Sequence, residues 1–334
     1  MKFLSVIILF AILPAAAHAQ DSMAILTLDK TVPLPNVNGR IDHMAVDVAG
    51  QRLFISALGN DTVEVVDLKT GKDIRSLPGF AEPQGMVYVP AFDRLFVANG
   101  SDGTVRILDG HSFATLRTIE LGDDADNVRY DAAAKKVYAG YGSGALAALD
   151  AQTGAKVADI PLAGHPESFR LTAGASLFVN VPDAGQIAVV DRDKGAVTAT
   201  WPMSCAQGNF PMYLDDANHH MFVGCRTPAT VLVYAFASNG MIPKVPDLVA
   251  RIPISSDTDD LFYDAANKLL YVSCGAGDVE VIKQNDADHY TKIETLPTAP
   301  GARTSLFVPE LKIFCLAVPH RGSQPAEIRI YKTP

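Results

Sequence analysis

The sequence predicts an all-β protein, a seven-bladed β-propeller whose blades are antiparallel sheets of four strands. Three observations carry this prediction: a strand-and-turn plan recurs seven times, its spacing matches one blade, and the last copy lacks one strand. The first copy spans residues 40–79, where MAVDV, RLFISA, TVEVVDL and DIRSL are strand-like runs separated by the turn-forming segments AGQ, LGND and KTGK. Each copy therefore predicts one small sheet.

The repeat is easiest to follow through its second strand. This strand reads, from the N-terminus onward, LFIS (53–56), LFVA (95–98), VYAG (137–140), LFVN (177–180), MFVG (221–224), LYVS (270–273) and IFCL (313–316). The offsets of 42, 42, 40, 44, 49 and 43 residues are close to the roughly 40–45 residues of a propeller blade. Because a four-stranded sheet cannot bury both of its faces alone, the copies must pack face to face until a ring closes.

The last copy indicates how the ring closes. It offers only three strands, SLFVPE, KIFCLAV and AEIRIYK, before the sequence given stops at Pro334. The segment LTLDKTVPL, residues 26–34, precedes the first copy and has the character of a fourth strand. We expect this N-terminal strand to join the C-terminal blade, which also removes an exposed sheet edge.

The N-terminal segment predicts export. Residues 1–19 contain Lys2, an apolar run and the small-residue site Ala17-His18-Ala19, which is typical of a cleaved signal peptide. Nothing later approaches the roughly 20 apolar residues of a membrane span. The sequence thus predicts a signal peptide over 1–19, a single propeller domain over 20–334, and a periplasmic or secreted protein. With its sheet edges paired, the ring is expected to be a monomer.

The net charge and the cysteines bear on two questions, whether the protein binds nucleic acid and whether it contains a disulfide. The formal net charge is −9, and an acidic chain without basic runs is a poor partner for nucleic acid, whose phosphates are bound mainly by Lys and Arg. Four cysteines follow the signal, Cys205, Cys225, Cys274 and Cys315, without metal-type spacing. Export permits a Cys205–Cys225 disulfide, while buried free thiols that pack as small hydrophobes are the alternative.

Two of the repeats carry a family resemblance. The units LFISALGNDTVEVVDLKTGK and LFVANGSDGTVRILDG resemble the YVTN-type repeat of the YncE-like β-propeller proteins, over essentially the whole chain after the signal. The resemblance implies the propeller fold. Stretches such as GRIDHMAVD, DDADNVRYD and DTDDLFYD resemble an exported bacterial subgroup, for which no particular activity is implied. The wider family is labelled DNA-binding, which the acidic charge of this chain does not favour.

The candidate site lies where the blades meet. In a propeller, the segments that lead into the first strand of each blade converge on one mouth of the central channel. One position there holds, blade by blade, Asp42, Gln84, Asp126, Glu167, Phe210, Asp259 and Arg303. The next position holds His43, Gly85, Asn127, Ser168, Pro211, Asp260 and Thr304. Such different chemistry at a point of convergence is typical of a pocket built from non-equivalent groups, although turns and hydrogen bonds between blades also favour Asp and Asn.

Binding of a small polar or anionic ligand in this funnel is the first interpretation. Arginines would clamp a carboxylate or phosphate, with acids and amides orienting them. The candidate ligand-binding residues are Arg226, Arg303, Arg321, Asp42, Asn127 and Asn209. The alternative is that these acids and arginines form ion pairs with one another that stabilise the fold and bind no ligand.

Metal-dependent catalysis is the second interpretation, by a hydrolase or lyase similar in principle to propeller lactonases and streptogramin lyases. Ca²⁺ or Mg²⁺ would be held by oxygen ligands and polarise a carbonyl, while a histidine moved the proton. The candidate metal ligands are Asp126, Glu167, Asp259 and Asp260, and the candidate catalytic histidines are His43, His165 and His320. A protein-interaction scaffold, which would need an apolar patch on the mouth face, is the third interpretation.

Overall fold

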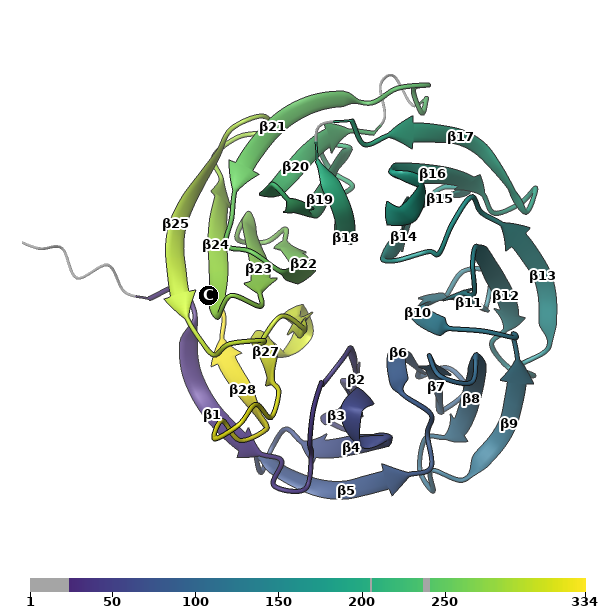
Figure 1. Cartoon of the computed structure of the whole chain (residues 1–334), viewed down its shortest axis with the longest axis vertical. Coiled ribbons are helices and arrows are strands. Elements are labelled where there is room, and N and C mark those ends of the chain that lie inside the picture. Colours follow the sequence, from purple (N-terminus) through teal and green to yellow (C-terminus); the bar gives the residue numbers. More distant parts are fainter. Residues whose placement is uncertain (1–23, 205, 237–240) are drawn as a thin grey trace, which may run out of the picture.

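The computed structural model describes residues 24–204, 206–236 and 241–334, which form seven four-stranded antiparallel sheets arranged in a ring (Figure 1). The first, innermost strands are β2 (Met44–Asp47), β6 (Pro83–Val89), β10 (Ala125–Asp131), β14 (Phe169–Leu171), β18 (Gln207–Asp215), β22 (Thr258–Asp264) and β26 (Ser305–Val308). The second strands are β3 (Arg52–Ala57), β7 (Arg94–Asn99), β11 (Lys136–Tyr141), β15 (Ser176–Val181), β19 (His220–Thr227), β23 (Leu269–Cys274) and β27 (Ile313–Val318). These second strands contain the seven tetrapeptides that define the repeat.

The third strands are β4 (Thr62–Asp67), β8 (Thr104–Asp109), β12 (Ala145–Asp150), β16 (Gln186–Asp191), β20 (Ala229–Ala235), β24 (Asp278–Gln284) and β28 (Glu327–Lys332). The outermost strands are β5 (Lys72–Pro78), β9 (Thr115–Glu120), β13 (Lys156–Pro161), β17 (Ala196–Pro202), β21 (Asp247–Pro253), β25 (Tyr290–Pro297) and β1 (Thr27–Pro33). Short 3₁₀ turns follow a strand at η1 (Leu58–Asn60), η2 (Pro182–Ala184) and η3 (Pro309–Leu311).

An aspartate ends the third strand of each of the first four blades and shapes the turn that follows. Oδ1 of Asp67 accepts the backbone N–H of Thr70, and Asp109, Asp150 and Asp191 accept the N–H three residues ahead in the same way. Such Asx turns supply hydrogen bonds that the strand ladder cannot. The repeated Asp therefore fixes the turn into the outermost strand.

The prediction of ring closure is confirmed. β1 pairs antiparallel with β28, with Val32 opposite Ile328, and completes the sheet β1-β28-β27-β26. Val32 is fully buried in a cluster that includes Ile328 and reaches Leu53 and Ile55 of the first blade. The N-terminal strand thus both completes the last blade and contributes to its contact with the first.

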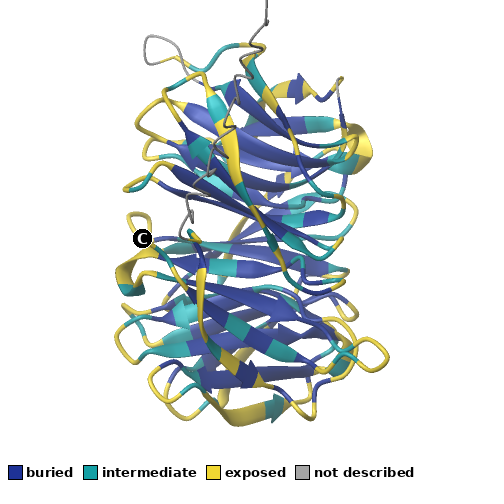
Figure 2. Ribbon diagram, turned by 90° about the vertical axis from the view of Figure 1, so that its left-hand side faces the viewer, coloured by how far each residue is buried: buried dark blue, intermediate teal, exposed yellow. Residues whose placement is uncertain are grey.

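Apolar side chains fill the spaces between blades. Val97, Phe96 and their neighbours on the second strands are fully buried, whereas the outermost strands expose most of their residues (Figure 2). Between the second and third blades, Phe96 and Ile107 pack with Val137 and Leu149. This face-to-face packing buries what a single sheet would leave exposed.

Two predictions fall partly outside the described residues. The signal peptide over 1–19 and Cys205 are not described, so the leader and the Cys205–Cys225 disulfide stay predictions; Cys225 itself is buried. Cys274 and Cys315 are buried free thiols that pack with apolar side chains. No helix of the described residues has the length and hydrophobicity needed to cross a membrane.

Candidate functional site

Irregularities in the innermost strands direct side chains into the mouth of the channel. The pairing of the first and second strands shifts register between Pro83 and Met86, and again between Ala125 and Val128. Similar shifts occur in β18 and β22. A bulge releases a residue from the regular ladder and re-aims its side chain. In these four blades it falls at the mouth positions that the sequence singled out.

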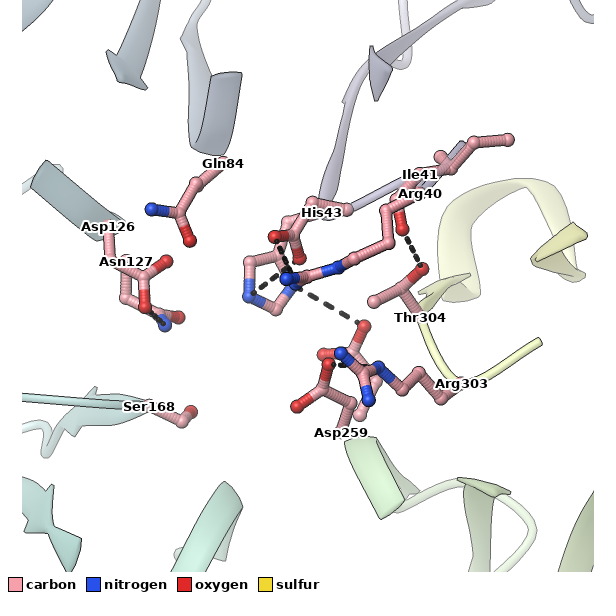
Figure 3. Close-up of polar contacts among 12 residues, drawn as sticks. Arg40, Ile41, His43, Gln84, Asp126, Asn127, Ser168, Asp259, Arg303 and Thr304 are labelled. Atoms are coloured by element: carbon pink, nitrogen blue, oxygen red, sulfur yellow. Dashed lines mark hydrogen bonds and ion pairs between the residues drawn. The ribbon is translucent and has the colours of Figure 1, made fainter. Parts of the chain in front are cut away.

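These positions line one polar cavity of about 240 Å³. Figure 3 shows Gln84, His43, Asp126 and Asp259 reaching toward a shared space from separate blades. The full lining is Arg40, Asp42, His43, Gln84, Asp124, Asp126, His165, Glu167, Phe210, Arg226, Asp259 and Arg303. All seven residues of the first mouth position are among them, so the blades meet there as the repeat register predicted.

Two of the three arginines that line the cavity, Arg226 and Arg303, are held by Asp257 and Asp259. Arg226 Nη2 lies 2.7 Å from Asp259 Oδ1, and Arg303 Nε lies 3.0 Å from Asp259 Oδ2. Arg303 Nη1 also lies 2.9 Å from Asp257 Oδ1, and the Arg226 guanidinium stacks 3.7 Å above the ring of Phe210. Burial raises the pKa of Asp259 to about 6, although both arginines oppose the rise. These pairs make the Arg226–Arg303 side of the cavity nearly neutral.

His43 is partly buried and is protonated at neutral pH. Its Nδ1 lies 3.5 Å from Asp260 Oδ2 and its Nε2 lies 3.8 Å from Asp42 Oδ1. Burial alone lowers the pKa of His43, but Asp260 and Asp42 outweigh it and raise the pKa to about 10. Asp260 is fixed in turn, because it accepts the backbone N–H of Ser305 at 2.8 Å.

His165 is oriented by a backbone carbonyl. Its Nδ1 lies 2.7 Å from Gly142 O, so Nδ1–H donates and Nε2 faces Asp126 Oδ2 at 3.8 Å. Burial lowers its pKa, but hydrogen bonding to Asp126 and to Gly142, with the charge of Asp124, raises it to about 9. Without another cation, Nε2 therefore keeps a proton at neutral pH.

Asp126, His165 and Glu167 form a compact donor cluster. One ligand atom of each residue lies within 4.8 Å of the other two. Burial, with the charges of Asp126 and Asp259, raises the pKa of Glu167 to about 8. A carboxyl group that retains a proton because other carboxylates surround it would ionise readily beside a cation. The cluster offers two carboxylates and one imidazole on one side of the cavity.

Other candidates lie elsewhere or have structural partners. Asn209 is buried and donates to Asn180 Oδ1 and to the carbonyl of Gln186, which ties neighbouring blades together. His320 and Arg321 are not among the residues that line the cavity; the backbone of Arg321 pairs with Gln324.

Asn127 and Asp260 stand beside the cavity rather than in it. Asn127 lies in β10, donates to Asp126 Oδ2 at 3.3 Å and accepts from Arg129. Asp260 faces deeper into the channel with His43.

Sequence reasoning missed two residues of the cavity. Asp124 stands two positions before Asp126 and accepts a hydrogen bond from Gln84 at 2.9 Å. Arg40 stands two positions before Asp42 and lies 3.2 Å from its carboxylate. In both blades the signal was available, since the charged residue lies two positions before the mouth residue, on the same approach to the channel.

The fold and the cavity together define a seven-bladed β-propeller with a polar, carboxylate-rich mouth. No protein-family model and no curated protein matches the chain. Among solved structures, the chain is similar to a chain of Kuenenia stuttgartiensis hydrazine synthase, at 17% identity and a TM-score of 0.72, over 90% of this chain and 96% of that one. It is also similar to a chain of a mitotic checkpoint complex, at 13% identity and a TM-score of 0.77, over 98% of both. At these identities the likeness shows the fold alone.

Proposed function

We propose that this protein is an exported, YncE-like propeller that binds a polar, anionic ligand at the channel mouth through a divalent cation held by Asp126, His165 and Glu167. The observation that carries the proposal is the convergence of three donor atoms within 4.8 Å in a carboxylate-rich cavity. Bonds of about 2.0–2.2 Å place two donor atoms of one ion at most about 4.4 Å apart, so a small inward shift of these side chains lets all three bind the same ion.

The orientation of His165 supports a metal ligand. Metal-binding histidines usually donate their second ring N–H to a carbonyl or carboxylate, which fixes the tautomer. Here Nδ1 meets Gly142 O, and Nε2 is directed at Asp126. Because one donor is an imidazole, the set favours Zn²⁺ or Mn²⁺ over Ca²⁺, which prefers oxygen ligands alone.

The cation also explains how an anionic ligand could enter an acidic cavity. Arg226 and Arg303 are already paired with Asp257 and Asp259, so they add little free positive charge. A divalent ion beside Glu167 would reverse the local charge and leave open positions for ligand oxygens. Recognition of the anion thus depends on the metal rather than on the arginines alone.

Catalysis and scaffolding receive less support. The predicted mechanism needs a histidine that accepts a proton, and the raised pKa of His43 leaves that histidine protonated at neutral pH. Several large apolar side chains of the described strands are exposed, such as Leu28, Ile74 and Leu116. They lie on the outermost strands and not around the mouth. A protein partner that binds an apolar mouth is therefore not favoured.

Calorimetry tests the proposal. Chelator-treated protein is titrated with Zn²⁺, Mn²⁺, Ca²⁺ and Mg²⁺, alongside Asp126→Asn and Glu167→Gln, with Glu120→Gln on the exposed face of β9 as the matched control. We expect one site for Zn²⁺ or Mn²⁺ that both cavity variants weaken by at least about tenfold, equivalent to about 1.4 kcal/mol, and that the control retains. Absence of binding by all four ions, or binding that both cavity variants retain, would contradict the proposal.

A further inference from the structure

The innermost strands carry a second pattern, deeper in the channel. Three residues after the first mouth position, the seven blades hold Ala45, Val87, Arg129, Arg170, Tyr213, Phe262 and Leu306. Charged side chains occur at this position only in the third and fourth blades, which are neighbours in the ring (Figure 1). Two adjacent arginines therefore interrupt an otherwise apolar or aromatic belt.

These arginines line a chamber of about 230 Å³ that is distinct from the mouth cavity. Arg129 and Arg170 share it with apolar side chains that include Ala45, Val87 and Phe262. His43 borders both spaces, and Asp260 lies at the chamber beside it. The chamber thus combines a cationic pair with an apolar wall.

Neither guanidinium has a carboxylate partner among the described residues, unlike Arg40, Arg226 and Arg303 at the mouth. Arg129 donates to Val128 O at 2.8 Å and to Asn127 Oδ1 at 2.9 Å, while its buried Nε lacks a hydrogen-bond partner there.

Arg170 is held by neutral groups as well. Its Nε donates to Met212 O at 2.8 Å, and its guanidinium lies 4.4 Å from the centre of the Tyr213 ring. Burial and the charge of Arg170 lower the pKa of Arg129, although the charges of Asp260 and Asp126 oppose the fall. Asp260, which lines the same chamber, is already paired with His43 and the Ser305 N–H.

We infer that this chamber binds a small organic carboxylate, with its anionic end on Arg129 and Arg170 and its hydrocarbon part against Ala45, Val87 and Phe262. Guanidinium groups bind carboxylates through parallel N–H donors. The anion would compensate two partly buried charges, and the apolar wall would gain contact area. The volume is below the roughly 300–1,000 Å³ of sites for drug-sized ligands, so the ligand is small.

The test uses benzoate, neutral benzyl alcohol and inorganic phosphate as probes, with chelator present so that no mouth cation takes part. Titration calorimetry should show benzoate binding at least about tenfold tighter than either of the others, equivalent to about 1.4 kcal/mol. Equal binding of benzoate and benzyl alcohol, or of benzoate and phosphate, would overturn the inference. So would absence of benzoate binding.

Two variants at one position supply a matched pair. Val87→Glu places a carboxylate in the chamber, whereas Val87→Gln adds a similar volume without charge. We expect Val87→Glu to lose benzoate binding by at least about tenfold and to unfold at a higher temperature than Val87→Gln. Benzoate binding that is equal in both would contradict the arginine assignment.

Arg129→Gln gives an independent check, because its result does not depend on whether the Val87 variants fold. It should weaken benzoate binding, and unchanged binding would refute the site. Glu167→Gln at the mouth should leave benzoate binding intact. This last result separates the chamber from the proposed metal site, since either can fail without the other.

Discussion

Replacing Glu167 by glutamine should stabilise the metal-free protein at alkaline pH and change its stability little at acid pH. The structure raises the pKa of Glu167 from its ordinary value of 4.5 to about 8, through burial and then the charges of Asp126 and Asp259. The unfolded chain releases this proton near its ordinary pKa, while the folded chain keeps it. The folded state therefore loses stability relative to the unfolded state as pH rises through that window.

The size of the effect follows from the two pKa values. The difference corresponds to at most about 5 kcal/mol of unfolding free energy above pH 8, at about 1.4 kcal/mol per pH unit. Because the cavity is open to solvent, which screens these charges, we expect about 1–3 kcal/mol. Glutamine carries no charge at any pH and escapes this loss, so the difference between the two proteins should grow as pH rises.

Urea unfolding followed by circular dichroism at about pH 5 and about pH 9, with chelator present, measures this difference. Glu120→Gln on β9 is the control, since Glu120 is exposed. The variant should exceed wild type in unfolding free energy at the higher pH alone. A stability difference that is the same at both pH values, or a less stable Glu167→Gln at pH 9, would refute the reasoning.

Three further results are expected. Zinc affinity, measured by calorimetry, should fall up to about 100-fold from pH 7 to pH 6, because His165 and Glu167 must each lose a proton to bind the ion; a flat profile would contradict this. In Asp260→Asn the pKa of His43, followed by NMR, should fall below its value of about 10, because the largest of the charges that raise it is removed while burial still lowers it; no change would show that Asp260 is not the main partner. Val32→Ala, in the closing strand, should cost about 1–3 kcal/mol of unfolding free energy in urea, and a neutral effect would argue against ring closure through β1.

The fold was predictable from the sequence because the same pattern of strands and turns is repeated in every blade. Turn residues, strand periodicity and spacing predict the same four-stranded sheet in each of the seven copies. A strand that is hard to recognise in one blade can therefore be placed by comparison with the others. Ring closure was predictable from the number of strands in each copy. The last copy has only three strands, and residues 26–34 supply the fourth. The register of the blades then placed Asp42, Asp126 and Glu167 at one cavity without knowledge of any contact.

The roles within the site were less predictable, because they depend on which side chains meet. Sequence proximity could not show that Asp259 would be held by Arg226 and Arg303, or that Asp260 would face His43. These contacts join separate blades. His165 is placed by a carbonyl of the preceding blade, Gly142 O, which no local motif encodes.

The channel interior was overlooked for a different reason. The two positions per blade that predicted the site both lie at the mouth of the channel. Arg129 and Arg170 lie three positions after the first mouth position, in β10 and β14, and line the chamber inside the channel. A third inward position, compared across the seven blades, exposes the two charges as exceptions in an apolar or aromatic belt.

The most direct test of the account is the location of a bound metal ion. Crystals of zinc-loaded protein, with anomalous data collected at the zinc edge, should show one strong peak at the mouth, bonded to Nε2 of His165 and to carboxylate oxygens of Asp126 and Glu167. The peak should be absent from crystals of Glu167→Gln. A wild-type structure at the same zinc concentration with no peak among these residues, or with zinc bound only at other sites, would contradict the central claim.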